Sequence, residues 1–229
     1  MIKAILFDFN GVIINDEPIQ MRAYQEALKS ENISLTEEEY YSALGMDDKA
    51  FVRFVFSKNG KELSEETMNA IIERKTEARR KVVDKELPLF DGAVNFIKAA
   101  SRACEIGLVT MARRKEIDYV LEKAGLENAF SAIVSAEDVS NHKPDPECFN
   151  LGFRLVDKKR TGNGGFPLVR SECLVIEDAP PGVVAGRNAG MKTLGITNTV
   201  SAQALRDAGA DIVASNLADL SVDAVAHLF

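Results

Sequence analysis

The chain has 229 residues, of which 46% are hydrophobic and 28% charged, which is the composition of a soluble globular protein with a sizeable core. Its formal net charge of −7 argues against a surface that neutralises nucleic-acid phosphates, so no nucleic-acid partner is expected. The three cysteines are widely spaced, and neither a disulfide framework nor a CxxC site is predicted. We expect a cytoplasmic protein that acts on a small molecule.

The N-terminal segment contains a short apolar run that ends at Asp8. It is neither a secretory signal nor long enough to span a bilayer, so no membrane partner is expected. We interpret Ile2–Phe7 as the first strand of a sheet.

The stretch 16–87 is rich in Glu, Lys, Ala and Leu at helical spacing and holds no comparable strand-like run. We predict a helical insertion after the first strand. Within it, the charged run 73–81 mixes both signs, as solvated helix faces do. Pro88 and the Asp91-Gly92 pair mark the return of the chain to the sheet, because proline and glycine punctuate element ends.

Beyond the insertion, apolar runs of strand length alternate with helical patterns. Such alternation predicts an α/β fold with a doubly wound parallel sheet covered by helices on both faces. The glycine-rich segment Thr161–Pro167 is predicted to be a flexible loop; a phosphate-binding loop is the weaker alternative, since no strand precedes it. The predicted strands are Ile106–Val109, Ala132–Val134, Cys173–Ile176, Thr193–Ile196 and Ile212–Val213.

Polar residues follow four of the predicted strands. In an open parallel sheet, ligands bind beyond the carboxyl ends of the strands. Taken singly, each of these residues is more often a helix cap, a backbone partner or an exposed charge. The four groups are Asp8-Phe9-Asn10-Gly11-Val12, Thr110, Lys143-Pro144-Asp145 and Glu177-Asp178.

Together and in this order, the four groups resemble the motifs of the haloacid dehalogenase (HAD) superfamily, and the resemblance covers nearly the whole chain. The AspGluPro at 16–18 opens an insertion similar to the small helical cap of the subgroup that contains β-phosphoglucomutase and phosphoglycolate-type phosphatases. The resemblance implies a Rossmann-like core formed by residues 1–15 and 88–229, with a helical cap formed by residues 16–87.

The resemblance further implies a Mg²⁺-dependent phosphatase or phosphotransferase that forms an aspartyl-phosphate at Asp8. A carboxylate that approaches a phosphate dianion is repelled, so a cation must intervene. Thr110 and Lys143 would hold the transferring phosphoryl group. The expected substrate is a small phosphorylated metabolite, and the expected state is a monomer or weak dimer. The implied metal ligands are Asp8, the backbone carbonyl of Asn10, Glu177 and Asp178.

Asn10 departs from the family pattern, which has an aspartate there as general acid and base. Asparagine has no proton to give near neutral pH, and such catalysis is typically worth ~10²–10⁴-fold. A slow phosphatase is therefore predicted. The alternatives are a catalytically impaired phospholigand-binding or regulatory protein, a β-phosphoglucomutase-like mutase, a dehalogenase, or an asparagine introduced experimentally to trap a complex.

Further residues are candidates for weaker roles. Met111, Asp47 and Arg113 are predicted to contact the substrate. Gln20 stands where many relatives have a histidine, which disfavours a mutase, and His142 is interpreted as a surface residue. Closure of the cap could bring an acid over Asp8 in place of the missing one. The candidate acids are Asp16, Glu17, Asp47 and Asp48.

Overall fold

The computed structural model describes residues 1–229 and contains one parallel sheet of six strands in the order β3-β2-β1-β4-β5-β6. The predicted doubly wound parallel sheet is confirmed. β1 begins two residues later than predicted, since the backbone N–H of Ile2 is directed to Ala226 near the C-terminus. The strands are β1 (Ala4–Phe7), β2 (Glu105–Val109), β3 (Ala132–Val134), β4 (Cys173–Glu177), β5 (Lys192–Ile196) and β6 (Ile212–Ala214).

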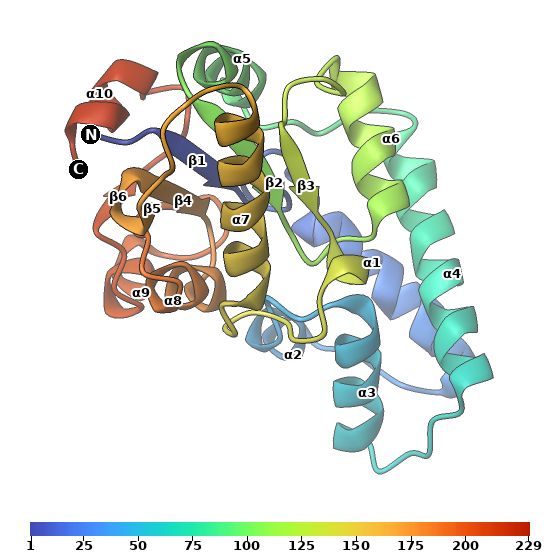
Figure 1. Ribbon diagram of the computed structural model, residues 1–229. Helices are drawn as coiled ribbons and strands as arrows, with labels where there is room; N and C mark the ends of the chain where they lie inside the picture. Colours follow the sequence, from blue (N-terminus) through green and yellow to red (C-terminus); the bar gives the residue numbers. More distant parts are fainter.

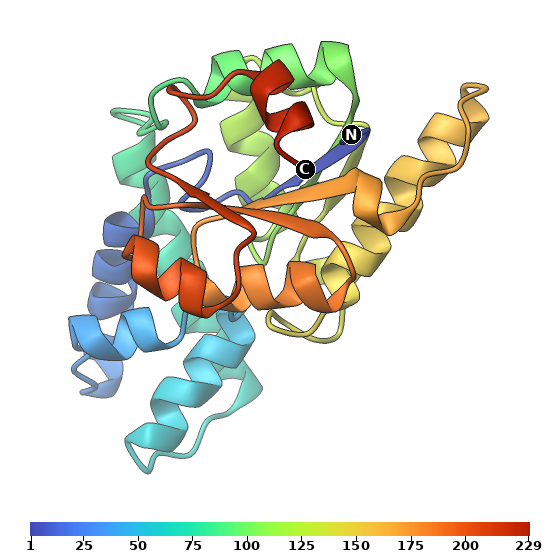
Figure 2. The ribbon, with the colours of Figure 1, turned by 90° about the vertical axis from the view of Figure 1, so that its left-hand side faces the viewer.

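Helices cover both faces of the sheet (Figures 1 and 2). Alternate residues of β1 enter different apolar clusters: Ile5 and Phe7 pack with α5, α6 and α10, and Ala4 and Leu6 pack with α7 and α8. Both faces are buried, which explains why the strand reads as a continuous apolar run. These helices are α5 (Ala93–Ala103), α6 (Arg114–Ala124), α7 (Glu147–Gly162), α8 (Pro180–Asn188), α9 (Ala202–Asp207) and α10 (Val222–His227), with short 3₁₀ turns at Ala136–Asp138 and Arg170–Glu172.

The predicted loop at 161–167 is shorter in the structure. α7 continues through Thr161 and Gly162, where the Thr161 hydroxyl donates to the carbonyl of Asp157 at 2.9 Å. The helix ends at Asn163, and Gly164 adopts a left-handed backbone with φ of +84°. The segment follows a helix and not a strand, so the structure does not support the phosphate-binding alternative.

Residues 16–87, the helical insert, form four helices and no strand. Their apolar side chains, among them Tyr24, Phe51 and Ile71, make a separate cluster. Two backbone hydrogen bonds, Asn15 to Pro88 and Phe90 to Ile13, hold its entry and exit side by side, and the two-domain division at residues 15/16 and 87/88 stays a prediction. No helix is both long and apolar enough to cross a bilayer. The helices are α1 (Glu17–Leu28), α2 (Glu37–Ser42), α3 (Asp48–Lys58) and α4 (Glu65–Val83), with a 3₁₀ turn at Lys29–Glu31.

The charged run 73–81 in α4 was predicted to be a solvated helix face, and this prediction is wrong for two of its cations, which point inward. Lys75 and Arg79 are each only 2% exposed. Four residues apart on a helix, they share one face, and that face packs on the rest of the insert and on α6. The other charged residues of the run, including Glu73 and Lys81, are exposed.

Candidate active site

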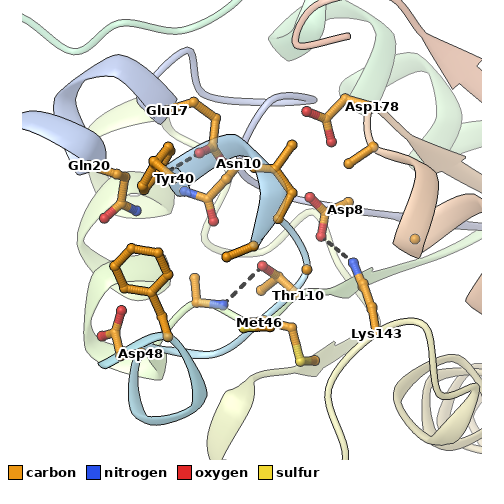
Figure 3. Close-up of a pocket in the computed structure, with 18 of the residues that line it drawn as sticks. Asp8, Asn10, Glu17, Gln20, Tyr40, Met46, Asp48, Thr110, Lys143 and Asp178 are labelled. Carbon is orange, nitrogen blue, oxygen red and sulfur yellow. Dashed lines mark hydrogen bonds and ion pairs between the residues drawn. The ribbon is translucent and has the colours of Figure 1, made fainter. Parts of the chain in front are cut away.

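A cavity of about 100 Å³ lies between the helical insert and the carboxyl ends of β1, β2 and β4 (Figure 3). It is large enough for several water molecules or a small ligand group. Both parts of the chain contribute to its lining. The predicted site residues that line it are Asp8, Asn10, Thr110, Met111, Lys143, Glu177 and Asp178.

Three carboxylates converge at the sheet side of the cavity. β1 pairs with β4 in parallel, Phe7 beside Ile176, so the residues that follow each strand meet at one edge. One oxygen from each of Asp8, Glu177 and Asp178 lies within 4.8 Å of the others. The Lys143 ammonium donates to Asp8 at 2.6 Å and to Glu177 at 2.5 Å.

The charges in this group, the sheet-end cluster, do not balance. Burial and the charge of Glu177 raise the pKa of Asp8 to about 7, although Lys143 opposes the shift. Burial and the other two carboxylates raise the pKa of Asp178 well above its usual range. Three hard-oxygen ligands with one ammonium fit a divalent cation such as Mg²⁺.

Gly11 makes space for the sheet-end cluster because it has no side chain. It has φ of +76°, and a Cβ there would lie 1.8 Å from the Asp178 Oδ2 atom. A larger residue would therefore displace Asp178 from the cluster. The GlyVal of the first motif is a packing requirement of the acidic site.

Thr110 lies beside Asp8 at the end of β2. Its hydroxyl oxygen accepts from the backbone N–H of Ala112 at 3.1 Å, which fixes the rotamer and leaves the hydroxyl proton available to a ligand. With the ammonium of Lys143, the site therefore offers two donors next to Asp8, where a phosphoryl group would carry its charge.

Asn10 takes part in a buried network with the insert. Its amide nitrogen donates to Asp16 at 2.8 Å, and the other Asp16 oxygen accepts from Arg79 at 2.6 Å. An aspartate at position 10 would instead set two carboxylates against each other. Asn10 is thus matched to its surroundings.

The four candidate acids of the insert occupy different positions. Asp16 is fully buried, does not line the cavity and is held by Arg79. Asp47 caps α3 by accepting from the backbone of Ala50 at 2.8 Å. Asp48 lines the cavity, but although burial raises its pKa, contacts with Lys75 and Tyr24 outweigh this and lower it.

Glu17 is the remaining one of the four, and it lines the cavity. The Tyr40 hydroxyl donates to it at 2.6 Å, and burial together with Asp16 raises the pKa of Glu17 to about 7. In Figure 3, Glu17 and Gln20 lie across the cavity from Asp8, Lys143 and Asp178. Glu17 therefore has a proton to exchange near neutral pH.

Two residues that were predicted to contact the substrate, Asp47 and Arg113, lie outside this cavity, and their contact with the substrate stays a prediction. Asp47 and Arg113 line a separate surface hollow, because Asp47 caps its helix and Arg113 pairs with Glu73 at 2.8 Å. His142 bonds to the carbonyl of Lys143 and does not line the cavity. Gln20 does line it.

Several lining residues were not predicted from the sequence. Lys75 belongs to the charged run of α4. Its four-residue spacing from Arg79 is the sequence feature that could have indicated a shared helix face. The aromatic residues carry no signal of their own, since core residues of helices look the same. The unpredicted lining residues with polar or aromatic side chains are Tyr24, Tyr40, Phe51, Lys75 and Glu116.

The fold and this site define a class of α/β proteins whose acidic site lies at the end of the central strand, beneath a helical insert. The family model of haloacid dehalogenase-like hydrolases matches residues 5–196, and the chain belongs to this family. The predicted family is confirmed.

Known relatives agree with this assignment. The chain is 29% identical to Protein SUPPRESSOR OF QUENCHING 1, chloroplastic, of Arabidopsis thaliana, in a match that covers 97% of this chain and 20% of that protein. It is 26% identical to the phosphorylated carbohydrates phosphatase of Thermotoga maritima, covering 91% and 92% of the two chains. The β-phosphoglucomutase of Clostridium difficile has the same fold, with a TM-score of 0.84, 22% identity and coverage of 98% and 96%.

Proposed function

We propose that the protein is a Mg²⁺-dependent phosphatase that hydrolyses a small phosphorylated metabolite, with water as the final acceptor. The observation that carries this proposal is the buried sheet-end cluster, in which three carboxylates lie together and Lys143 pairs with only two of them. The relative from Thermotoga maritima is a phosphatase of phosphorylated carbohydrates, so sugar phosphates are the substrates to test first.

Asp8 would attack the phosphorus atom, form an acyl phosphate and release the alcohol, after which water would hydrolyse the acyl phosphate. Bound by Asp8, Asp178, Glu177 and the Asn10 carbonyl, Mg²⁺ would offset the repulsion between Asp8 and the phosphate dianion. Lys143 would keep Asp8 oriented, and the Thr110 hydroxyl would donate to a phosphoryl oxygen.

Glu17 is the group that we propose gives the leaving alcohol its proton. It lines the cavity from the side opposite Asp8, where the leaving oxygen of an in-line displacement would lie. Asn10 cannot perform this step, because its side chain is an amide.

A second candidate function is phospholigand binding with little turnover. One observation favours it: Asn10 donates to Asp16, which is paired with Arg79, so the site is arranged around an amide and not an acid.

The test is Mg²⁺-dependent hydrolysis of acetyl phosphate, p-nitrophenyl phosphate and sugar phosphates. Asp8→Asn should lower every rate by at least about 10³-fold, whereas Asp91→Asn, at an exposed aspartate, should not. A normal rate in Asp8→Asn would refute the nucleophile. Mg²⁺-dependent binding of phosphate esters without turnover would support the second candidate.

The same assay tests Glu17. Glu17→Gln should slow sugar phosphates, which have poor leaving groups, by about 10²-fold or more, and p-nitrophenyl phosphate far less. Equal effects on both substrates would argue against proton donation by Glu17.

A further inference from the structure

The part of the cavity away from Asp8 has a chemical character that the proposed reaction does not use. We name it the head-group pocket, since it would hold whatever carries the phosphate. Gln20 and Asp48 mark it in Figure 3. Its polar and aromatic lining consists of Gln20, Tyr24, Asp48, Phe51, Lys75 and Glu116.

Three hydrogen-bond acceptors in the head-group pocket have no hydrogen-bond partner. They are Gln20 Oε1, Asp48 Oδ2 and Glu116 Oε1, all buried. Glu116 has only a long ion pair with Lys75, at 3.5 Å. Buried polar atoms without partners are costly and uncommon. All three atoms are covered by protein but belong to side chains that line one cavity, so a ligand in the cavity would supply the donors once these side chains turn toward it.

The protein's own donors around this pocket are already used. The Tyr24 hydroxyl donates to Asp48 at 2.5 Å and Lys75 donates to the same oxygen at 2.9 Å. The Tyr40 hydroxyl is bound to Glu17. A ligand group that carries only acceptors, such as a carboxylate or phosphate, would have to share donors that Asp48, Glu116 and Glu17 already use.

The charge of the pocket disfavours an anion as well. The cavity is lined by two cations, Lys75 and Lys143. Lys143 is bound by Asp8 and Glu177, and Lys75 is shared between Asp48 and Glu116. A second anionic group would thus be buried beside two carboxylates with no cation to itself.

We propose that the head-group pocket selects phosphate monoesters of neutral, hydroxyl-rich molecules and rejects esters that bear a second anionic group. Hydroxyl groups would donate to Gln20, Asp48 and Glu116, and the rings of Tyr24 and Phe51, whose centroids are 4.3 Å apart, give the pocket an apolar wall. This inference rests on the proposed phosphatase function.

Esters matched in chain length and phosphate position test it. Glucose 6-phosphate is compared with 6-phosphogluconate, and glycerol 3-phosphate with 3-phosphoglycerate, each with Mg²⁺ present. We expect kcat/KM, or the Kd from calorimetry where turnover is slow, to favour the neutral ester by at least about tenfold. An equal or reversed preference in both pairs, or no binding of either neutral ester, would overturn the proposal.

Glu116→Gln tests the assignment of the pocket. It removes one of the two charges that share Lys75, so the neutral-to-acidic ratio should fall by about tenfold. Glu122→Gln, on the exposed side of the same helix, is the matched control and should leave the ratio unchanged. An unchanged ratio in folded Glu116→Gln would overturn the assignment.

A second variant covers the case in which Glu116→Gln does not fold. Gln20→Met deletes an acceptor without changing charge and should lower kcat/KM, or weaken Kd, for the neutral esters by about tenfold. An unchanged kcat/KM and Kd for the neutral esters would count against the pocket.

Acetyl phosphate, which has no hydroxyl groups, separates the failure of this inference from the failure of the proposed function. If its hydrolysis needs Asp8 but the neutral and acidic esters are hydrolysed or bound equally well, the head-group inference alone fails.

Discussion

Two groups of buried charges meet at the cavity, and they are balanced differently. In the sheet-end cluster, three carboxylates lie together and Lys143 pairs with two of them, Asp8 and Glu177. In the insert, Asp16 has the guanidinium of Arg79 to itself and also accepts from Asn10. A buried charge without a counter-charge is costly, whereas a paired and hydrogen-bonded one can be retained. The first group therefore needs a cation from outside, whereas the carboxylate of the second already has its counter-charge.

Asn10 is the link between these two groups. It follows the nucleophile strand by sequence, and its amide is bonded to the insert. Its neutral side chain adds no further negative charge between the two groups. Variants at position 10 are therefore the strongest test of the difference in charge balance between the two groups.

Among the variants that probe this comparison, Asn10→Asp is expected to have the largest effect. The new carboxyl group would lie against Asp16, and because like charges at this distance share a proton, one of the two should remain protonated near neutral pH. A proton donor beside Asp8 should raise kcat/KM for sugar phosphates by about 10²-fold or more. The pH–rate profile should show a proton donor whose apparent pKa lies above that of an ordinary aspartate.

Asn10→Ala is the matched control for this gain. It removes the amide without adding an acid, so it should give no increase in rate. If Asn10→Asp also gives none while the protein stays folded, position 10 does not limit turnover. The difference in charge balance between the two groups would then affect the structure of the site but not the rate of turnover.

The two sides of the cavity also differ in how far the sequence could predict them. The sheet side was predictable, because parallel strands end at one edge of the sheet and the residues after each strand must meet there. Its residues are Asp8, Thr110, Lys143 and Asp178. Their order also matched known motifs.

The insert side was not predictable in the same way. Its residues come from separate helices, and nothing in a helical period tells which face will lie over the sheet. Lys75 and Arg79 were misread as solvated because charged residues are seldom buried, and only the ion pairs with Asp48 and Asp16 explain their burial. The partners are 27 and 63 residues away in sequence.

A second prediction concerns the cation that the sheet-end cluster needs. The pKa of Asp8 is raised from 3.8 to about 7, so the metal-free protein should lose stability as pH rises from about 4 through about 7. Mg²⁺ binds the deprotonated form and should reverse this loss. At about 100 times its Kd it should add about 2.7 kcal/mol, or roughly 5–10 °C in Tm, at pH 7.5 and clearly less at pH 5.5.

Thermal unfolding with Mg²⁺ or EDTA at both pH values measures this effect. Asp178→Asn removes a proposed ligand and should abolish most of the stabilisation by Mg²⁺. An equal gain in Tm at both pH values, or a full gain in Asp178→Asn, would mean that the cation binds elsewhere.

The smallest expected effect is at Asp47, which lies outside both groups of charges. Its carboxylate caps α3, so Asp47→Ala should lower the free energy of unfolding by about 1 kcal/mol, while Asp47→Ser should keep most of the cap. Neither change should alter kcat/KM for the preferred ester, since Asp47 does not line the cavity. Denaturant unfolding and steady-state kinetics separate the two quantities. A lower kcat/KM in folded Asp47→Ser would mean that Asp47 contacts the substrate. The head-group pocket would then extend beyond Asp48 to the start of α3.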